Sequence, residues 1–170
     1  ERLFERYRRG DPVALRTLGQ ALEFWLNCST RRSTDAPRDR QPRSGEVQSD
    51  DLPLLDDERL RELCALEAAL ERPILPGLVR AFRESSVALL ATLAEQVRTA
   101  DSAGVRVSAH TLAGAAVNLG TLRLARTAKW LEASSADAPG ATLSAAVSRA
   151  REECELSTCE LERRYPLADA

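Results

Sequence analysis

Leucine and alanine dominate this chain, and residues that favour β-strands are scarce. The 170 residues include 26 leucines and 27 alanines, against nine valines, two tyrosines and one isoleucine. Leucine and alanine are strong helix formers, whereas branched and aromatic residues are the ones enriched in strands. We therefore predict an all-α fold.

Charge and hydrophobicity exclude several classes of protein. The net charge is −2 and the pI is about 5.6, which argues against a nucleic-acid binder that works through a basic surface. Apolar residues make up 44% of the chain, enough for a core. No uninterrupted run of about 18 apolar residues occurs, so we expect no membrane span and no direct membrane contact. The charged N-terminus without a methionine predicts a piece of a longer protein rather than a secretory signal.

The chain has four cysteines and one histidine, a poor set for a metal site. None of the cysteines forms a CxxC pair, and they are Cys28, Cys64, Cys154 and Cys159. A zinc site would need ligands that this spacing does not supply. We expect reduced thiols in a cytoplasmic protein, with tethering to the inner membrane open through other parts of a longer chain.

The pattern along the chain divides it into three parts. In residues 1–27, Asp11 and Pro12 are typical of a helix start, and an apolar stripe follows at helical spacing. Residues 28–53 are polar and rich in Ser, Arg, Asp and Pro, which predicts a flexible linker. Residues 54–170 contain apolar positions at helical spacing throughout and form the folded part.

Five helices are expected in the folded part, near residues 56–70, 73–100, 104–119, 121–135 and 143–161. The first has a stripe of Leu60, Leu63, Leu66 and Leu70. The second has a stripe of Leu78, Phe82, Leu89, Leu93 and Val97, with Ser85 or Ser86 in the gap. Short connections favour antiparallel neighbours. We therefore predict an antiparallel up-down four-helix bundle with an extra short N-terminal helix.

The third predicted helix carries the only histidine, His110, on a face with few charges. On a helical wheel, His110 lies roughly 140° from the middle of the apolar face, so the imidazole points outward. The apolar face consists of Val105, Ala109, Leu112, Ala116 and Leu119. The outward face includes Ala103, Arg106, Val107, Ala113, Gly114, Val117 and Asn118. No charged residue occurs from Val107 to Leu122, which is typical of a docking surface.

Gly114 stands one turn after the histidine. Side chains on a helix lean toward its N-terminus, so the residue four places later normally covers the preceding position. A glycine inside a helix costs ~1 kcal/mol relative to alanine. Clearing an approach path to His110 is a reason for that cost, and close helix packing is the alternative.

The segment His110-Thr111-Leu112-Ala113-Gly114-Ala115-Ala116, followed by Gly120, resembles the phosphorylation motif of histidine-containing phosphotransfer (HPt) domains. The resemblance covers about residues 52–165 and includes Phe82. It implies a four-helix bundle in which His110 accepts a phosphoryl group through Nε2 from a receiver aspartyl phosphate and passes it to another receiver aspartate. Response-regulator receivers would then be the partners. The chain itself would have no cofactor, since Mg²⁺ sits on the receiver, and would not be an autonomous kinase.

The family motif has a lysine at the position of Ala113, where it helps to neutralise the phosphoryl group. Arg106 lies on the histidine side but leans away from it. The next helix offers Arg123, Arg126 and Lys129 as electrostatic support, or as an ordinary solvated face. Residues 1–27 are similar to the last helix of a receiver domain, which in hybrid sensor kinases often precedes an HPt module.

Two other functions stay open at this point. The first is a degenerate helical module that binds a signalling partner through the uncharged face without phosphoryl transfer, which the missing lysine favours. The second is a metal or acid–base site at His110. The second is disfavoured, because we find no second histidine and expect no acidic residue on that face.

Overall fold

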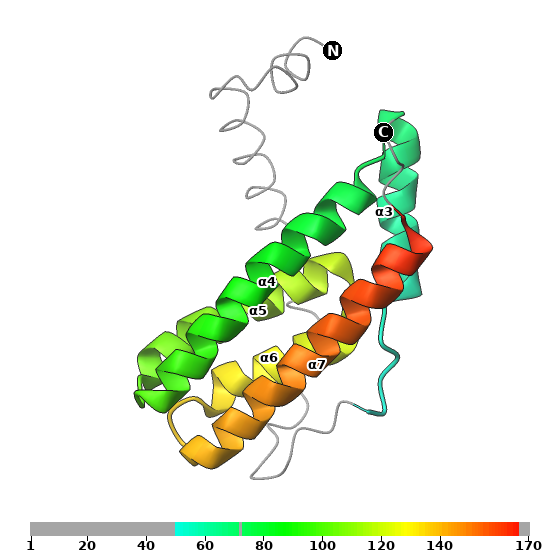
Figure 1. Cartoon of the computed structure of the whole chain (residues 1–170). Helices are drawn as coiled ribbons and strands as arrows, with labels where there is room; N and C mark the ends of the chain where they lie inside the picture. Colours follow the sequence, from blue (N-terminus) through cyan, green and yellow to red (C-terminus); the bar gives the residue numbers. More distant parts are fainter. Residues whose placement is uncertain (1–49, 72, 167–170) are drawn as a thin grey trace, which may run out of the picture. The chain divides into compact units, whose positions relative to one another are not determined.

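The computed structural model describes residues 50–71 and 73–166, which form five α-helices (Figure 1). The predictions for residues 1–49 lie outside the described residues. The helices are α3 (Asp57–Leu70), α4 (Leu75–Arg98), α5 (Ser102–Leu119), α6 (Leu122–Ser134) and α7 (Gly140–Arg164). Within the described ranges no strand occurs, and the all-α prediction is confirmed.

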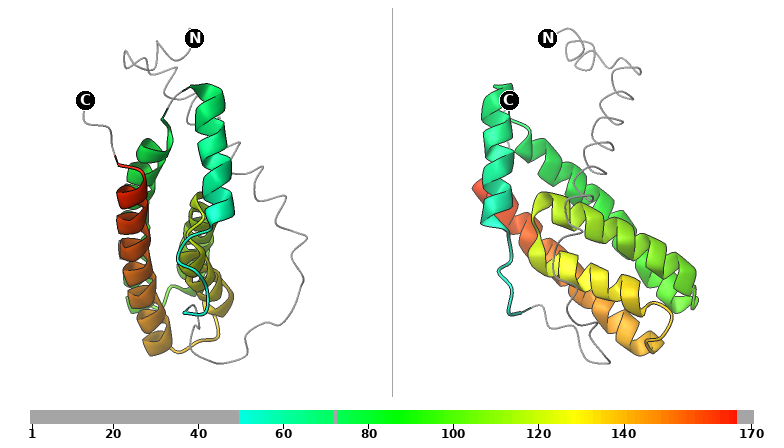
Figure 2. Two further views of the ribbon diagram at one scale, coloured as in Figure 1. Left: turned by 90° about the vertical axis from the view of Figure 1, so that its right-hand side faces the viewer. Right: turned by 180° about the vertical axis from the view of Figure 1, so that it is seen from behind.

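Helices α4 to α7 form the predicted four-helix bundle. Helix α4 contacts α5 and α7, and α6 contacts the same two helices from the opposite corner (Figures 1 and 2). Connections of two to five residues, at 99–101, 120–121 and 135–139, join consecutive helices. Links this short make successive helices antiparallel.

The bundle is closed by leucines from all four helices. The fully buried leucines include Leu90, Leu93, Leu112, Leu124, Leu131 and Leu161. Each such side chain contributes roughly 1.5–3 kcal/mol of transfer free energy. The predicted stripe on α4 was partly wrong: Phe82 and Leu93 are buried and Ser86 fills the gap, but the structure buries Val79 and Leu90 where we expected Leu78 and Leu89. The reason is that α4 faces two neighbours, α5 and α7, which together select a rotated and wider face.

Helix α3 is the predicted extra helix, and only its first half is buried. Leu60 and Leu63 are buried, whereas Leu66 and Leu70 are 36% and 56% exposed, so the four-leucine stripe was wrong in its second half. Figure 2 shows α3 at one end of the bundle, with its later turns extending past α5 and α6. The stripe predicts a helix correctly but cannot tell where the bundle ends.

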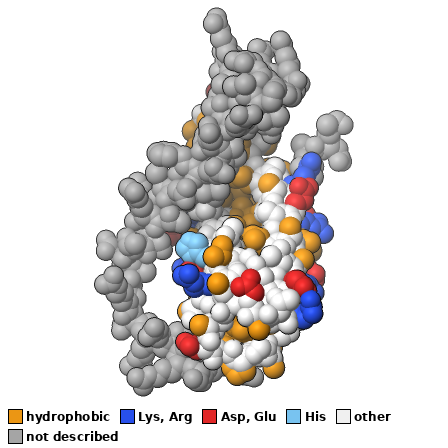
Figure 3. Space-filling view, turned by 90° about the vertical axis from the view of Figure 1, so that its left-hand side faces the viewer, with side chains coloured by type: hydrophobic (Ala, Val, Ile, Leu, Met, Phe, Trp, Pro, Cys, Tyr) orange, Lys and Arg blue, Asp and Glu red, His pale blue; other side chains and the backbone are white. Residues whose placement is uncertain are grey.

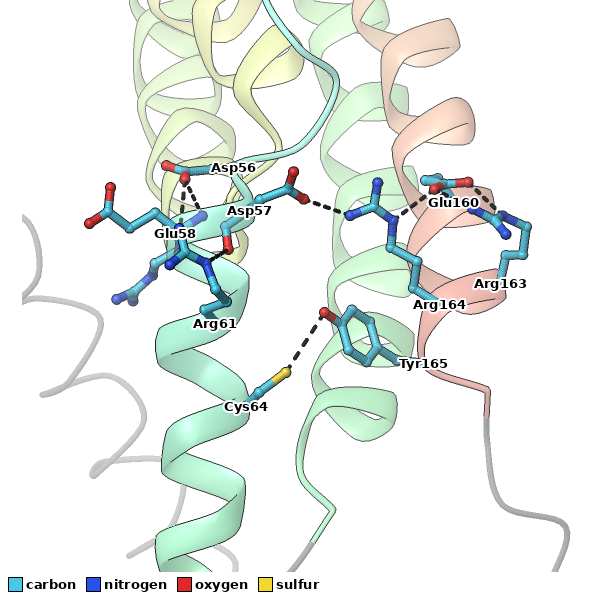
Figure 4. A network of polar contacts seen from close by, with 10 residues as sticks. Asp56, Asp57, Glu58, Arg61, Cys64, Glu160, Arg163, Arg164 and Tyr165 are labelled. Carbon is cyan, nitrogen blue, oxygen red and sulfur yellow. Dashed lines mark hydrogen bonds and ion pairs between the residues drawn. The ribbon is translucent and has the colours of Figure 1, made fainter.

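Polar contacts tie α3 to the end of α7 (Figure 4). Arg164 donates to Asp57 at 2.7 Å, and the Cys64 thiol lies 3.7 Å from the Tyr165 hydroxyl. Hydrogen bonds from Arg163 and Arg164 lower the pKa of Glu160 to about 2. The contacts orient α3 across the bundle end, although exposed ion pairs of this kind contribute little stability.

The segment before α3 is held to the α5–α6 turn. The Asp56 amide donates to the Gly120 carbonyl at 2.8 Å, and the Leu122 amide donates to the Leu54 carbonyl at 3.1 Å. Arg123 also donates to the Leu52 carbonyl at 2.7 Å. Leu52 therefore contacts the bundle, although the linker predicted at residues 28–53 includes it.

Gly120 makes this close approach possible. Its φ is +79°, and an added Cβ would lie 3.2 Å from the Asp56 side chain and 3.3 Å from that of Arg59. Left-handed backbone costs a residue with a Cβ roughly 1–2 kcal/mol.

We expect Gly120→Ala to lower the free energy of unfolding by about 2 kcal/mol, because the backbone strain and the close contacts of the added Cβ both destabilise the folded state. Urea unfolding followed by circular dichroism measures this. Gly77→Ala, where an added Cβ meets nothing within 4 Å, is the control and should leave the midpoint unchanged or raised. An unchanged midpoint in Gly120→Ala would contradict the prediction.

The described cysteines are free thiols, as expected for Cys64, Cys154 and Cys159. Cys154 is buried, and burial raises the pKa of its thiol. Cys159 is exposed.

Candidate functional site

Helix α5 presents His110 to solvent from the middle of its length. The Asp101 carboxylate caps the helix by accepting from the Gly104 amide at 2.9 Å, and Gly120 ends it. The side chain of His110 is 73% exposed. The predicted outward orientation of the imidazole is therefore confirmed, and Figure 3 shows it standing on the surface beside a basic side chain.

The predicted inner face of α5 is also confirmed. Its five members are all buried: Val105, Ala109, Leu112, Ala116 and Leu119. They pack between α4 and α6, so the opposite face of α5, which carries His110, is left facing solvent.

Two residues assigned to the outward face are buried instead. Ala113 is 4% exposed because it lies at the edge of the inner face, where the second neighbouring helix widens the buried arc. Asn118 is buried because the start of α3 covers that end of α5, with the Arg59 side chain donating to the Asn118 carbonyl at 3.0 Å. Ala113 is therefore not part of an exposed docking surface.

The other outward residues are accessible. Ala103, Arg106 and Val107 are exposed before the histidine, and Val117 is exposed after it. Val107 is 62% exposed, so it offers apolar contact area beside the histidine. The docking surface, as the structure defines it, comprises Ala103, Arg106, Val107, Gly114 and Val117 around His110.

Gly114 is half-buried, and a Cβ added to it would meet nothing within 4 Å. Tight packing against another helix, the alternative explanation for a glycine here, is therefore excluded. The missing side chain leaves space beside the imidazole rather than making room for a neighbour.

Glu132 is the residue of the site that our sequence reasoning missed. It reaches across from α6, and its Oε1 lies 2.9 Å from Nδ1 of His110. The expectation that no acidic residue lies near this face was wrong. A carboxylate can only accept, so this contact selects the tautomer in which Nδ1 carries the proton and Nε2 presents its lone pair to solvent.

The three basic residues predicted on the next helix are not equivalent. Arg123 is half-buried and bonded to the segment before α3, on the first turn of α6. Arg126 and Lys129 are exposed, and Lys129 lies three residues before Glu132. Arg123 therefore holds the segment before α3 in place, whereas Lys129 is exposed on the same helix.

This arrangement suits a nucleophile better than a metal ligand. Nδ1 is engaged by a carboxylate, and Nε2 is open to a bulky partner over a surface of mostly small and apolar residues. In the described ranges 50–71 and 73–166, no three His, Cys, Asp or Glu side chains are grouped to hold a metal ion.

None of the described helices is long and apolar enough to cross a membrane.

The site is thus an exposed histidine, hydrogen-bonded to a carboxylate, in the middle of one helix of a four-helix bundle. Residues 77–158 match the family model of the Hpt domain. This segment is just under half of the chain, and the match supports a phosphorelay role in two-component signalling for it. Members of this family interact with response-regulator receiver domains.

A solved structure has the same fold. Histidine-containing phosphotransfer protein B (HptB) from Pseudomonas aeruginosa PAO1 superposes with a TM-score of 0.59 at 24% sequence identity. The match covers 68% of this chain and 96% of that chain. No curated protein matches the chain.

Proposed function

We propose that His110 accepts a phosphoryl group from the aspartyl phosphate of one receiver domain and passes it to an aspartate of another. The observation that carries the proposal is the bond from Nδ1 to Glu132, which leaves Nε2 as the nucleophile on an exposed face of mostly small and apolar residues. Transfer forms the Nε2–P bond and breaks the P–O bond of the aspartyl phosphate. The receiver carboxylate leaves, and the reverse steps load the next receiver.

Glu132 is a positioning residue in this proposal. The ring becomes positively charged as Nε2 bonds to phosphorus, and the Glu132 carboxylate next to Nδ1 compensates that charge. The proton on Nδ1 stays in this hydrogen bond during the step. The receiver supplies the Mg²⁺ and the acidic residues, so the chain itself needs no cofactor. We place this exchange in the cytoplasm.

The docking surface fits a transient partner. Val107 and Val117 supply apolar contact on both sides of the histidine, and Gly114 leaves room for the approaching receiver. A surface of five residues around His110 suits a transient signalling complex, which buries less than about 1,200 Å².

The test is phosphoryl uptake from a receiver that carries ³²P on its aspartate. We expect label on this chain that is lost in acid and retained in base, as a phosphoramidate bond requires. Label that survives acid, or no label under conditions where the receiver stays phosphorylated, would contradict the proposal.

Ala113, which replaces the family lysine, favours the second candidate, a module that binds receivers without transfer. Receiver binding with no uptake would establish that candidate.

A further inference from the structure

The phosphoryl group on His110 lacks the cation that the family motif places at position 113. Ala113 is neutral and buried, so nothing at that position can meet the phosphoryl charge. Glu132 adds a negative charge to the site. If the proposed function holds, the balancing positive charge has to come from another part of the bundle.

The antiparallel pairing of α5 with α6 identifies the residue of α6 that lies level with Ala113. The two helices are joined by two residues and run antiparallel, and the His110–Glu132 contact sets their register. Both helices rise about 1.5 Å per residue. Three positions after His110 on α5 therefore face three positions before Glu132 on α6, and Lys129 lies level with Ala113.

The surroundings leave the Lys129 ammonium group free to reach the site. Lys129 is exposed and, within the described part of the chain, forms no ion pair. Three residues separate it from Glu132, so both project from the same face of α6. The Cα–Cβ bond of Lys129 tilts toward the start of α6 and away from the level of His110. The four-carbon stem is long enough to turn back across the rise of about 4.5 Å between the levels of residues 113 and 110. Ala113 and Gly114 place no bulky side chain in between.

The two arginines of α6 are less suited to this position. Arg123 is bonded to the Leu52 carbonyl at the far end of the helix. Arg126 lies about one further turn from Glu132 than Lys129 does. Lys129 is also the only lysine among the 170 residues.

We propose that Lys129 contacts the phosphoryl group on Nε2 of His110 and supplies, from α6, the charge compensation that Ala113 cannot give. The ammonium group stays protonated and takes no part in bond making. It stabilises the negative charge of the phosphoryl oxygens during transfer and in the phosphohistidine. This role rests on the proposed function of His110.

The first experiment measures the rate of transfer from a phosphorylated receiver to Lys129→Gln. We expect a loss of about tenfold, since a charge-assisted contact to the phosphoryl group is removed. Arg151→Gln is the matched control. It removes the same charge from an exposed position on α7, a helix that does not contact α5. We also expect Ala113→Lys to restore part of the rate in the Lys129→Gln chain, provided that its thermal melt shows a folded bundle. A Lys129→Gln rate equal to that of Arg151→Gln would overturn the proposal.

The second experiment uses the single lysine as a spectroscopic probe. Reductive methylation with ¹³C-formaldehyde keeps the charge and gives one lysine signal, which Lys129→Gln assigns by its absence. Phosphoramidate, a small donor that phosphorylates imidazoles, loads His110 without any receiver. We expect the Lys129 methyl signal to shift on loading and to return when acid removes the phosphoryl group. A signal that does not respond would overturn the contact.

The two experiments separate the two proposals. If receivers fail to load the chain, the proposed function is wrong, and the phosphoramidate experiment still decides whether Lys129 meets a phosphoryl group on His110. If receivers load the chain at the same rate with and without Lys129, only the role of Lys129 is wrong.

Discussion

His110→Gln is expected to abolish phosphoryl uptake from a phosphorylated receiver, with a fall of at least roughly a thousandfold. Glutamine is similar in length and can still hydrogen-bond to Glu132, but its amide nitrogen has no lone pair that attacks phosphorus. Quantifying ³²P on the chain after incubation with the labelled receiver measures the effect.

The substitution should leave the bundle intact. The side chain of His110 is 73% exposed, and substitutions at such positions usually change stability by within about 0.5 kcal/mol. Circular dichroism and a urea titration check this. Because His110 is the only histidine in the chain, no other imidazole can take its place. Acid-labile label that persists in His110→Gln would show that another group is the acceptor.

The fold followed from composition and spacing because helices of this kind are specified locally. On α5, the apolar positions predicted the buried face, and the outward direction of His110 came from the same count. On α4, leucines or valines occupy neighbouring positions, such as Leu78 with Val79 and Leu89 with Leu90. Periodicity alone could not decide between them, because the choice depends on where α5 and α7 lie.

Contacts between helices were harder to predict. Glu132 lies 22 residues after His110 and belongs to no motif that we singled out. A signal for it did exist: in a hairpin of two helices joined by Gly120 and Thr121, the residue facing His110 falls near position 131. Counting across the turn would have placed an acidic side chain beside the imidazole. The burial of Asn118 by the start of α3 had no such signal, since it depends on how the chain enters the bundle.

These findings alter the electrostatics of the site relative to the family motif. The motif places a cation on the helix of the histidine, whereas here a carboxylate of α6 contacts the histidine and an exposed lysine lies three residues before that carboxylate. The carboxylate acts on Nδ1, and the lysine is proposed to act on the group bound to Nε2. In that proposal, each charge lies on the side of the imidazole where the opposite charge develops.

Gly114→Leu is expected to slow transfer from a phosphorylated receiver by between about tenfold and a hundredfold, or 1.4–2.8 kcal/mol, without unfolding the bundle. A leucine at this position would extend toward the preceding turn and cover the approach to His110. Nothing lies within 4 Å of a Cβ at position 114, so the added side chain begins in open space. The stability of the bundle should rise by several tenths of a kcal/mol, up to ~1, because leucine is the better helix former. Stability and transfer should therefore change in opposite directions, a combination that damage to the fold cannot produce.

Gly77→Leu is the matched control, since position 77 also has open space around it but lies on α4, at the start of the helix. Rapid-quench measurement of the transfer rate for both variants decides the matter: equal rates would mean that receivers do not approach His110 over Gly114.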